Sequence, residues 1–265
     1  MIKKIFIIFV SILIILWFLT PVFLIVLASL TPSEDYYDQQ RILPKRLTFD
    51  HLYKLFVVLD GWRATLNSLQ VAAMAIGLSF LVGLPAGYVL TRYVFPGKNA
   101  IRLSILLTRS FPTLIIAVPL IMIYLRLGIG DTLFSVALAH TSFILPFVVL
   151  ITTSILSGIS VEYEEAGMIF GLSRIGAFMK ITLPLALPGL AASAIFAFIM
   201  SWNEVFISSV LTFVNRTLPA QILNTAMTSP DYFKFAAGTV MAIPAMVFIF
   251  FTRKYLMSMW GISLK

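Results

Sequence analysis

The sequence predicts an all-α polytopic membrane protein, and two observations carry this prediction. Of its 265 residues, 60% are hydrophobic and 11% are charged, whereas soluble domains are about half apolar and about a quarter charged. The charged residues fall in short clusters between long uncharged runs, an arrangement that keeps charge out of the hydrocarbon core of a bilayer. A water-soluble globule is therefore excluded. The absence of cysteine also excludes disulfides, thiolate metal sites and cysteine nucleophiles, and the two histidines disfavour a histidine metal site.

Six runs are long and apolar enough to cross a bilayer, which requires about 20 residues. They lie at approximately 5–30, 64–90, 105–125, 133–156, 185–211 and 235–256, and we expect them to form a single transmembrane domain over residues 1–265. The first run is too long for the apolar core of a cleaved signal peptide, so we expect it to be retained. An even number of spans places both termini on the same side of the membrane.

Basic residues near the helix ends predict that both termini are cytoplasmic. Lys3 and Lys4 precede the first run, and Arg41 is the first basic residue after it. The predicted inner side then carries Arg92, Lys98, Arg102, Arg174, Lys180, Arg253, Lys254 and Lys265. The outer segment 31–63 holds basic and acidic residues in equal number, which indicates a small, solvated folded loop.

Small residues recur at four-residue spacing in the second and fifth runs. They are Ala75, Ser79, Gly83 and Gly87 in the second, and Gly189, Ser193, Ala197 and Ser201 in the fifth. Such stripes let another helix approach closely. They predict packing inside the bundle, with an intersubunit face as the alternative.

The segment 158–184 predicts a helix–turn–helix on the cytoplasmic side. Ser160 is a suitable N-cap, and the acidic residues of the first turn favour the positive end of the helix dipole. Gly171 can end this helix with a positive φ, and Ser173 can cap a second short helix. We expect Pro184 to stop that second helix. An ordinary amphipathic surface hairpin is the alternative.

The same segment contains a spaced motif, with matching positions at Glu165, Ala166, Gly167, Gly171, Ile181, Leu183 and Pro184. This motif resembles that of the inner-membrane permease subunits of ABC importers, whose pattern is Glu-Ala-Ala, three residues, Gly, nine residues and Ile-x-Leu-Pro. The second alanine of the pattern is replaced by Gly167. Gly128–Thr132, Pro188-Gly189 and Ser201–Glu204 resemble the carbohydrate branch, in particular the shorter permease of a maltose-type pair.

The resemblance implies a type I importer permease with six spans, and it implies the partners of such a subunit. These are a cytoplasmic ATPase dimer, a larger homologous permease and an external solute-binding protein, with membrane lipid around the bundle and no nucleic acid. The chain carries no phosphate-binding loop, so ATP and Mg²⁺ are expected in the ATPase subunits, this chain needs no cofactor and it is not an enzyme. The residues expected to couple it to the ATPase are Glu164, Glu165, Ala166, Gly167, Gly171, Leu172 and Pro184. The tail 261–265 differs from the branch pattern, so a contact between this tail and the ATPase is not expected.

Glu204 is the one acid in the fifth run, and an ionisable group inside an apolar segment is a functional candidate. It could line the solute pathway with Trp202 and Asn203, or lie at the outer interface and pair with Arg216 or helix-end amides. A proton-relay role is a third interpretation. His140 is a packing residue or a substrate ligand, and Arg109 is expected to reach the inner interface.

The function expected from the resemblance is ATP-driven import of a mono- to oligosaccharide across the cell membrane. A permease for another solute, such as a polyamine or a phosphonate, is the alternative within the family. A proton-coupled secondary transporter that uses Glu204 is the alternative outside it.

Overall fold

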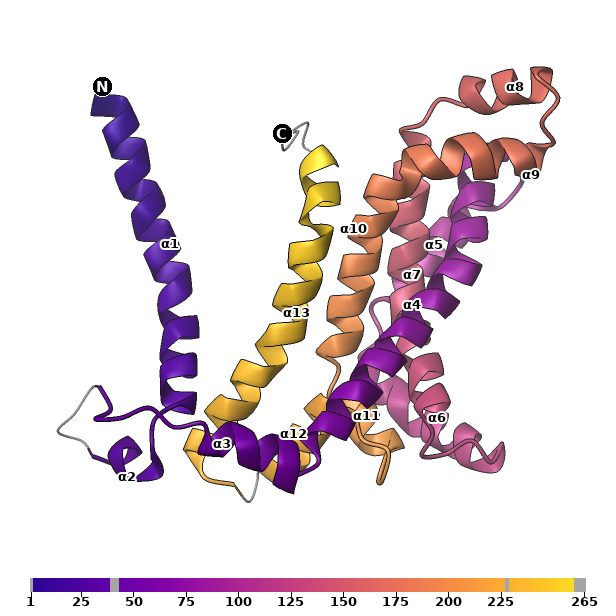
Figure 1. Ribbon diagram of the computed structural model, residues 1–265. Helices are drawn as coiled ribbons and strands as arrows, with labels where there is room; N and C mark the ends of the chain where they lie inside the picture. The colour runs from indigo at the N-terminus through magenta and orange to yellow at the C-terminus, as the bar shows by residue number, and fades with distance from the viewer. Residues whose placement is uncertain (1, 39–42, 227–228, 260–265) are drawn as a thin grey trace. The chain divides into compact units, whose positions relative to one another are not determined.

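The computed structural model describes residues 2–38, 43–226 and 229–259, and within these ranges every regular element is a helix (Figure 1). Arg41, Lys265 and the tail 261–265 lie outside the described residues. The helices are α1 (Ile2–Ser29), α2 (Ser33–Tyr36), α3 (Asp50–Tyr53), α4 (Gly61–Arg92), α5 (Lys98–Thr108), α6 (Thr113–Arg126), α7 (Leu133–Ser157), α8 (Glu162–Ile169), α9 (Arg174–Ala177), α10 (Leu183–Trp202), α11 (Phe206–Leu211), α12 (Leu218–Ala226) and α13 (Asp231–Met259). Two π-helical segments, Lys54–Val58 and Phe178–Thr182, complete the set.

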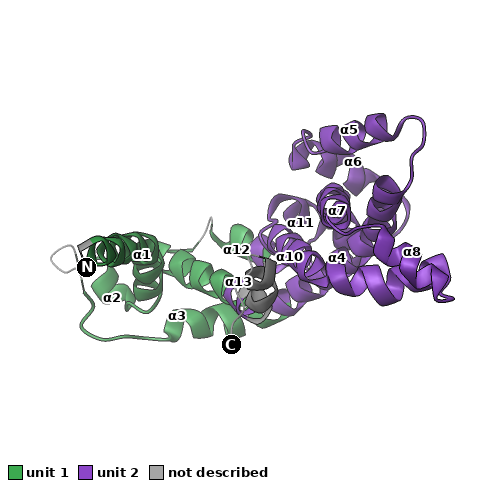
Figure 2. Cartoon of the chain, turned by 90° about the horizontal axis from the view of Figure 1, so that it is seen from above, with its two compact units in different colours: residues 1–63, 221–244 green, residues 64–220, 245–265 purple. Residues whose placement is uncertain are grey.

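The chain divides into two compact units, coloured separately in Figure 2. One comprises residues 1–63 and 221–244, and the other comprises residues 64–220 and 245–265. The expectation of a single permease domain over 1–265 is not tested by this division and stays a prediction. All the site residues discussed below belong to the second unit.

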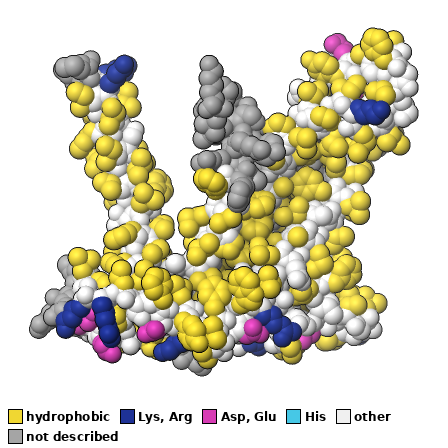
Figure 3. Space-filling model, viewed as in Figure 1, with side chains coloured by type: hydrophobic (Ala, Val, Ile, Leu, Met, Phe, Trp, Pro, Cys, Tyr) yellow, Lys and Arg dark blue, Asp and Glu magenta, His cyan; other side chains and the backbone are white. Residues whose placement is uncertain are grey.

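Four helical stretches of the described residues are long and apolar enough to span a membrane: 3–29, 61–92, 133–157 and 174–202. A fifth is obtained if the bent pair α5 and α6 is counted as one span. The expected count of six is therefore not confirmed. Figure 3 shows hydrophobic side chains over most of the visible surface, with charged side chains gathered near the helix ends, as a lipid environment requires.

The third expected span, 105–125, is wrong as a continuous helix. α5 ends at Thr108 and α6 begins at Thr113, with the two axes bent by 92°. Pro112 explains the break, because its ring disfavours helical geometry in the preceding residue and it has no N–H to donate. Pro112 is instead the N-cap of α6, with φ −60° and ψ 133°.

The fifth expected span, 185–211, is also interrupted. α10 ends at Trp202, and α11 begins again at Phe206. Glu204 drives the interruption, because its carboxylate accepts the backbone N–H groups of Ile207 and Ser208 at 2.8 and 3.0 Å. A side chain that takes these amides replaces the carbonyls of a continuing helix and starts a new one.

Pro184 does not stop the second arm of the 158–184 segment, so that expectation is wrong. The chain is helical from Arg174 to Trp202 through α9, the π-helical turn and α10. In the turn, the N–H of Leu183 bonds to the carbonyl of Phe178, five residues back. Such π-adjustments let a membrane helix keep a proline. The second arm is thus the beginning of a membrane-spanning helix.

The small-residue stripes pack inside the unit, as the first of the two interpretations holds. A Cβ added at Gly83 would lie 2.8 Å from Val148, and one at Gly87 would lie 2.7 Å from Thr152, so α4 and α7 are in close contact. A Cβ at Gly189 would lie 2.7 Å from Ile155 on the same α7. Only glycine lets the backbones of α4 and α10 approach α7 this closely.

Candidate functional site

α8 forms the first arm of the helical hairpin at 158–184. A side-chain contact supports its first end, and a backbone turn closes its second end. The hydroxyl of Ser160 accepts the N–H of Glu162 at 3.3 Å, although Val161, and not Ser160 as expected, is the N-cap. At the other end Gly171 has φ +90°, as predicted. The N–H groups of Gly171 and Leu172 bond to the carbonyls of Met168 and Gly167, which is a Schellman motif.

The second arm starts at Ser173, whose hydroxyl accepts the N–H of Gly176 at 3.1 Å, as predicted for a cap. Gly167 lies against Ile181, with no space between them for an unshifted Cβ. The two arms of the hairpin are therefore packed directly on each other.

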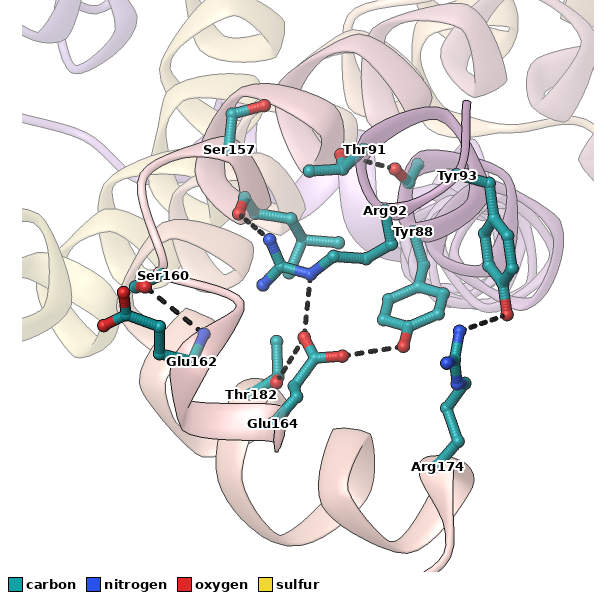
Figure 4. A network of polar contacts seen from close by, with 12 residues as sticks. Tyr88, Thr91, Arg92, Tyr93, Ser157, Ser160, Glu162, Glu164, Arg174 and Thr182 are labelled. Carbon is teal, nitrogen blue, oxygen red and sulfur yellow. Dashed lines mark hydrogen bonds and ion pairs between the residues drawn. The ribbon is translucent and has the colours of Figure 1, made fainter. Parts of the chain in front are cut away.

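Glu164 anchors the hairpin to the spanning helices through a buried polar network (Figure 4). Glu164 is only 3% exposed to solvent. Its carboxylate accepts bonds from Arg92 Nε at 2.8 Å, the Tyr88 hydroxyl at 2.7 Å and the Thr182 hydroxyl at 2.8 Å. Arg92 in turn donates to the carbonyl of Leu156 at 3.2 Å. One carboxylate thus joins α4, α8 and the π-helical turn, and Arg92 extends the network to α7.

The pKa of Glu164 follows from this environment. Burial raises the pKa, but the hydrogen bonds from Tyr88, Thr182 and Arg92, together with the positive charge of Arg92, outweigh burial and hold the pKa below its ordinary value. The group is therefore an ionised partner of Arg92 at neutral pH. Breaking a buried pair of this kind is costly, and the three donors satisfy both oxygens of the carboxylate.

A second contact ties the start of the second arm to the end of α4. The Arg174 guanidinium donates to the Tyr93 hydroxyl at 3.1 Å and lies 5.5 Å from the centre of the Tyr93 ring. Both residues are exposed. This contact adds a solvent-accessible attachment to the buried one.

The residues expected to couple the chain to an ATPase divide into an inner and an outer set. Glu164 and Gly167 are buried inside the hairpin, and Leu172 is half-buried. Glu165 and Ala166 are exposed on α8. The turn adds three strongly exposed apolar side chains, Ile169, Phe170 and Ile175, at 84%, 88% and 77%. The coupling role of these residues stays a prediction.

The expected pathway residues are brought together only in part. Trp202 is buried and stacks on Phe198, with 5.8 Å between the ring centres. Asn203 is exposed, and its side-chain amide caps the carbonyl of Ile199 at 3.0 Å. The side chains of Trp202 and Asn203 therefore do not meet at one common site.

His140 and Glu204 do lie together, in a buried cluster with two serines. The His140 ring nitrogens lie 2.8 Å from the Ser201 hydroxyl and 3.1 Å from the Ser208 hydroxyl. His140 Nε2 is also 3.4 Å from the Glu204 carboxylate. Of the partners considered for Glu204 at an interface, the structure shows the helix-end amides of Ile207 and Ser208. The cluster holds α7 against the break between α10 and α11.

Asp131, in the Gly128–Thr132 motif, clamps a loop. Its carboxylate accepts the backbone N–H groups of Phe213, Val214 and Asn215 at 2.9 to 3.2 Å. Its backbone carbonyl receives the Asn215 side-chain amide at 2.9 Å. The motif therefore joins the loop before α7 to the loop after α11.

Sequence reasoning missed Tyr88, Arg92 and Thr182 as parts of the site. The sequence places Arg92 only among the basic residues of the predicted inner side, and Thr182 lies at the position that the Ile-x-Leu-Pro pattern leaves open. Tyr88 is one residue beyond the small-residue stripe that packs on α7. The first turn of α8 holds three acids, and the helix dipole accounts for all of them, so the sequence does not single out Glu164 as the partner of Arg92.

Comparison with known proteins places the chain among transport components. Residues 79–258 match the family of binding-protein-dependent transport system inner membrane components. The chain is 29% identical over 237 residues to the trehalose transport system permease protein SugB of Mycobacterium tuberculosis, covering 87% of this chain and 86% of that protein. It is 30% identical over 188 residues to the spermidine/putrescine transport system permease protein PotC of Haemophilus influenzae, covering 71% and 73%. A chain of a bacterial ABC transporter involved in the import of the acidic polysaccharide alginate has the same fold, with a TM-score of 0.73, 20% identity and coverage of 96% and 97%.

Proposed function

This chain belongs to the family of binding-protein-dependent transport system inner membrane components, and we propose that it translocates a carbohydrate as one membrane subunit of an ATP-driven importer. It is a non-catalytic permease component of an ABC transporter in the inner membrane. ATP and Mg²⁺ then belong to a separate ATPase dimer. A larger permease and an external binding protein complete the proposed complex, and both termini of this chain are cytoplasmic.

The observation that carries the proposal is the anchored hairpin. It presents exposed acidic residues on α8 and an exposed apolar turn, while Glu164 binds it to α4 and the π-helical turn. Its second arm continues into the spanning helix that ends at Trp202. A displacement of this hairpin by an ATPase would therefore move the spanning helices without an intervening flexible joint.

The link between the hairpin and the spanning helices suggests how the subunit would alternate between inward-facing and outward-facing states. Closure of the ATPase dimer on ATP would shift α8, and the Glu164–Arg92 pair and the continuous helix 174–202 would carry the shift into α4 and α10. The break at 203–205 lies at the end of the helix 174–202, and the break at 109–112 lies between α5 and α6. They provide places where the transmitted motion can open or close a path.

A carbohydrate is the solute we favour, because the trehalose permease is similar over most of both chains. The likeness to a spermidine/putrescine permease over a shorter stretch supports a polyamine as the second candidate. A proton-coupled mechanism through Glu204 is less supported, since both carboxylate oxygens are engaged by backbone amides and Ser208.

The test is ATP-dependent uptake by proteoliposomes that contain the chain with its ATPase, larger permease and binding protein. A panel of neutral and acidic saccharides, spermidine and a phosphonate is offered one at a time. We expect uptake of a saccharide that requires ATP and the binding protein. Uptake of spermidine alone, or uptake driven by a proton gradient without ATP, would contradict the proposal.

Coupling is tested in the same system with Glu165→Lys, and Glu162→Lys is the matched control on the same exposed helix. We expect Glu165→Lys to lower binding-protein-stimulated ATP hydrolysis or to release the ATPase from the membrane. The control should retain both properties. Equal behaviour of the two variants would show that Glu165 does not contact the ATPase.

A further inference from the structure

Arg109 lies at the break inside the bent pair α5 and α6, which counts as one membrane span when the two helices are taken together. The sequence predicts instead that Arg109 reaches the inner interface. Arg109 follows the last residue of α5, at the 92° break before α6. Its guanidinium lies 3.8 Å from the centre of the Phe147 ring. Phe147 is ten residues from the end of α7, or about 15 Å along the helix, and about 21 Å from its start. Arg109 is therefore close to half-way along a spanning helix.

A positive charge at this depth needs a function or a partner, because ionisable groups are costly near the centre of a bilayer. Among the described residues, no carboxylate forms an ion pair with Arg109. Its contact with the Phe147 ring is a cation–π interaction, and Phe147 in turn packs on Phe196 of α10, with 5.0 Å between ring centres. This stack holds the guanidinium in place and leaves its donors available.

The guanidinium borders a cavity of about 430 Å³ at the same break. Its volume falls within the range of small-molecule sites, about 300 to 1,000 Å³. The lining residues are Thr108, Arg109, Phe111, Thr113, Ile116, Ser142, Phe143, Pro146, Phe147 and Met200. Three residues with hydroxyls, three with aromatic rings and one arginine thus line one open and largely apolar pocket.

This combination fits a sugar ring better than the other candidate solutes. Aromatic faces pack on the C–H faces of a sugar, and the guanidinium donates to its oxygens. The hydroxyls of Thr108 and Ser142 donate to the carbonyls of Ile105 and Ala139, and they can accept hydrogen bonds from the sugar hydroxyls. The positive end of the α6 dipole lies at Thr113 and adds to the preference for oxygen-rich or anionic groups. A polycationic polyamine would be repelled by Arg109.

We propose that this cavity is a solute-binding site on the translocation pathway, where Arg109 donates hydrogen bonds to the oxygens of one sugar unit. The inference rests on the proposed function and names the place in this chain where the saccharide is held. A lipid phosphate could satisfy the same guanidinium, and the experiment below separates the two sources.

The test uses cysteine labelling, for which the chain is suited because it has no cysteine of its own. Ser142→Cys and Thr113→Cys are introduced separately into the assembled importer and exposed to an anionic and to a cationic methanethiosulfonate reagent. Ser193→Cys, at a buried position of α10, is the inaccessible control. We expect both cavity cysteines to react, and the anionic reagent to react about tenfold faster than the cationic one.

The charge of Arg109 is tested by repeating the labelling in an Arg109→Gln background. The anion preference should disappear there, and it should persist with Arg126→Gln at the far end of α6. Two cysteine positions keep the test informative if one variant fails to assemble. Unreactive cavity cysteines, or an anion preference that survives Arg109→Gln, would overturn the proposal.

Protection separates a sugar from a lipid. The saccharide selected in the uptake panel should slow the labelling of both cysteines, in discs of neutral phosphatidylcholine and of anionic phosphatidylglycerol alike. Slower labelling only in phosphatidylglycerol, with no effect of the saccharide, would assign the site to lipid and overturn the proposal. The labelling needs no transported solute, so its failure is distinct from an importer that carries no saccharide.

Discussion

The Glu164 carboxylate accepts hydrogen bonds from Tyr88, Arg92 and Thr182, and the residue is almost fully buried. Its neighbour Glu165 points to solvent from the same helix turn. Two adjacent acids therefore have different tasks, since one holds the hairpin in place and the other is available to a partner. Their exposure separates these tasks, although both lie in the same short motif.

Glu164→Gln should lower the stability of the chain, because it leaves Arg92 buried without a counter-charge. Breaking a buried ion pair costs about 3 kcal/mol or more, and the midpoint of thermal unfolding of the purified complex should fall accordingly. Glu162→Gln, on the exposed start of the same helix, is the control and should leave the midpoint unchanged. A Glu164→Gln protein as stable as the parent would show that the network contributes no stability.

The contribution of Glu164 should depend on pH in a defined direction. Its pKa in the folded chain is held below the ordinary value of 4.5, so the unfolded state binds the proton first as the pH falls. The stability difference between the parent and Glu164→Gln should be constant from pH 7 to about pH 5 and shrink below 4.5. Unfolding midpoints across this range measure it, and a difference that widens on acidification would be inconsistent with a lowered pKa.

At the scale of elements, the helix breaks and turns are controlled by single side chains. Gly171 permits the Schellman turn, Pro112 separates α5 from α6, and Glu204 starts α11. Pro184, by contrast, continues a helix because the π-helical turn precedes it. A proline in the sequence therefore has different effects according to the backbone around it.

Gly171→Ala should weaken the hairpin, because Gly171 has φ +90° and a Cβ is disfavoured there by about 1 kcal/mol. No neighbouring atom lies within 4 Å of that Cβ, so the effect isolates backbone strain. Hydrogen exchange of the amides in 167–173 should increase. Gly158→Ala, at φ −80°, is the control and should leave this exchange unchanged.

Asp131→Ala should release the loop after α11, since three backbone amides lose their acceptor. Faster hydrogen exchange at residues 213–215 is the expected result. Asp60→Ala is a matched control, because Asp60 and Asp131 share a φ of 52° and both substitutions perturb the backbone alike. Exchange at 213–215 that responds equally to both changes would refute the clamp.

At the scale of the whole molecule, the permease fold brings three features into one unit: the anchored hairpin, the polar cluster around His140 and the cavity at Arg109. α7 contacts all three, through Leu156, His140 and Phe147. A helix shared in this way can relate a movement of the hairpin to the two polar sites along its length. The coupling experiment addresses the hairpin end of this helix, and the labelling experiment addresses its middle.

The sequence by itself determined the membrane class, the family and the approximate bounds of α1, α4 and α7, because hydropathy and motif spacing are local properties. It also predicted the Gly171 turn and the Ser173 cap, which depend on single residues and their nearest neighbours. The breaks at 109–112 and 203–205 were not predicted, because the sequence favours continuous apolar spans there. Pro112 is a local signal for the first break, whereas the second depends on the bonds from Glu204 to the amides of Ile207 and Ser208.

Only the tertiary structure decided that Glu164 is buried and Glu165 exposed, that Pro184 lies within a helix, and that Arg109 borders a cavity half-way along α7. The position of Arg109 and the burial of Glu164 depend on partners 38 to 76 residues away, such as Phe147 for Arg109 and Arg92 and Tyr88 for Glu164. Pro184 stays within its helix through the adjacent π-helical turn. Hydropathy and motif spacing predict the secondary structure and membrane preference of a segment taken by itself. The burial of a charge is settled by which distant donors the packed helices bring to it.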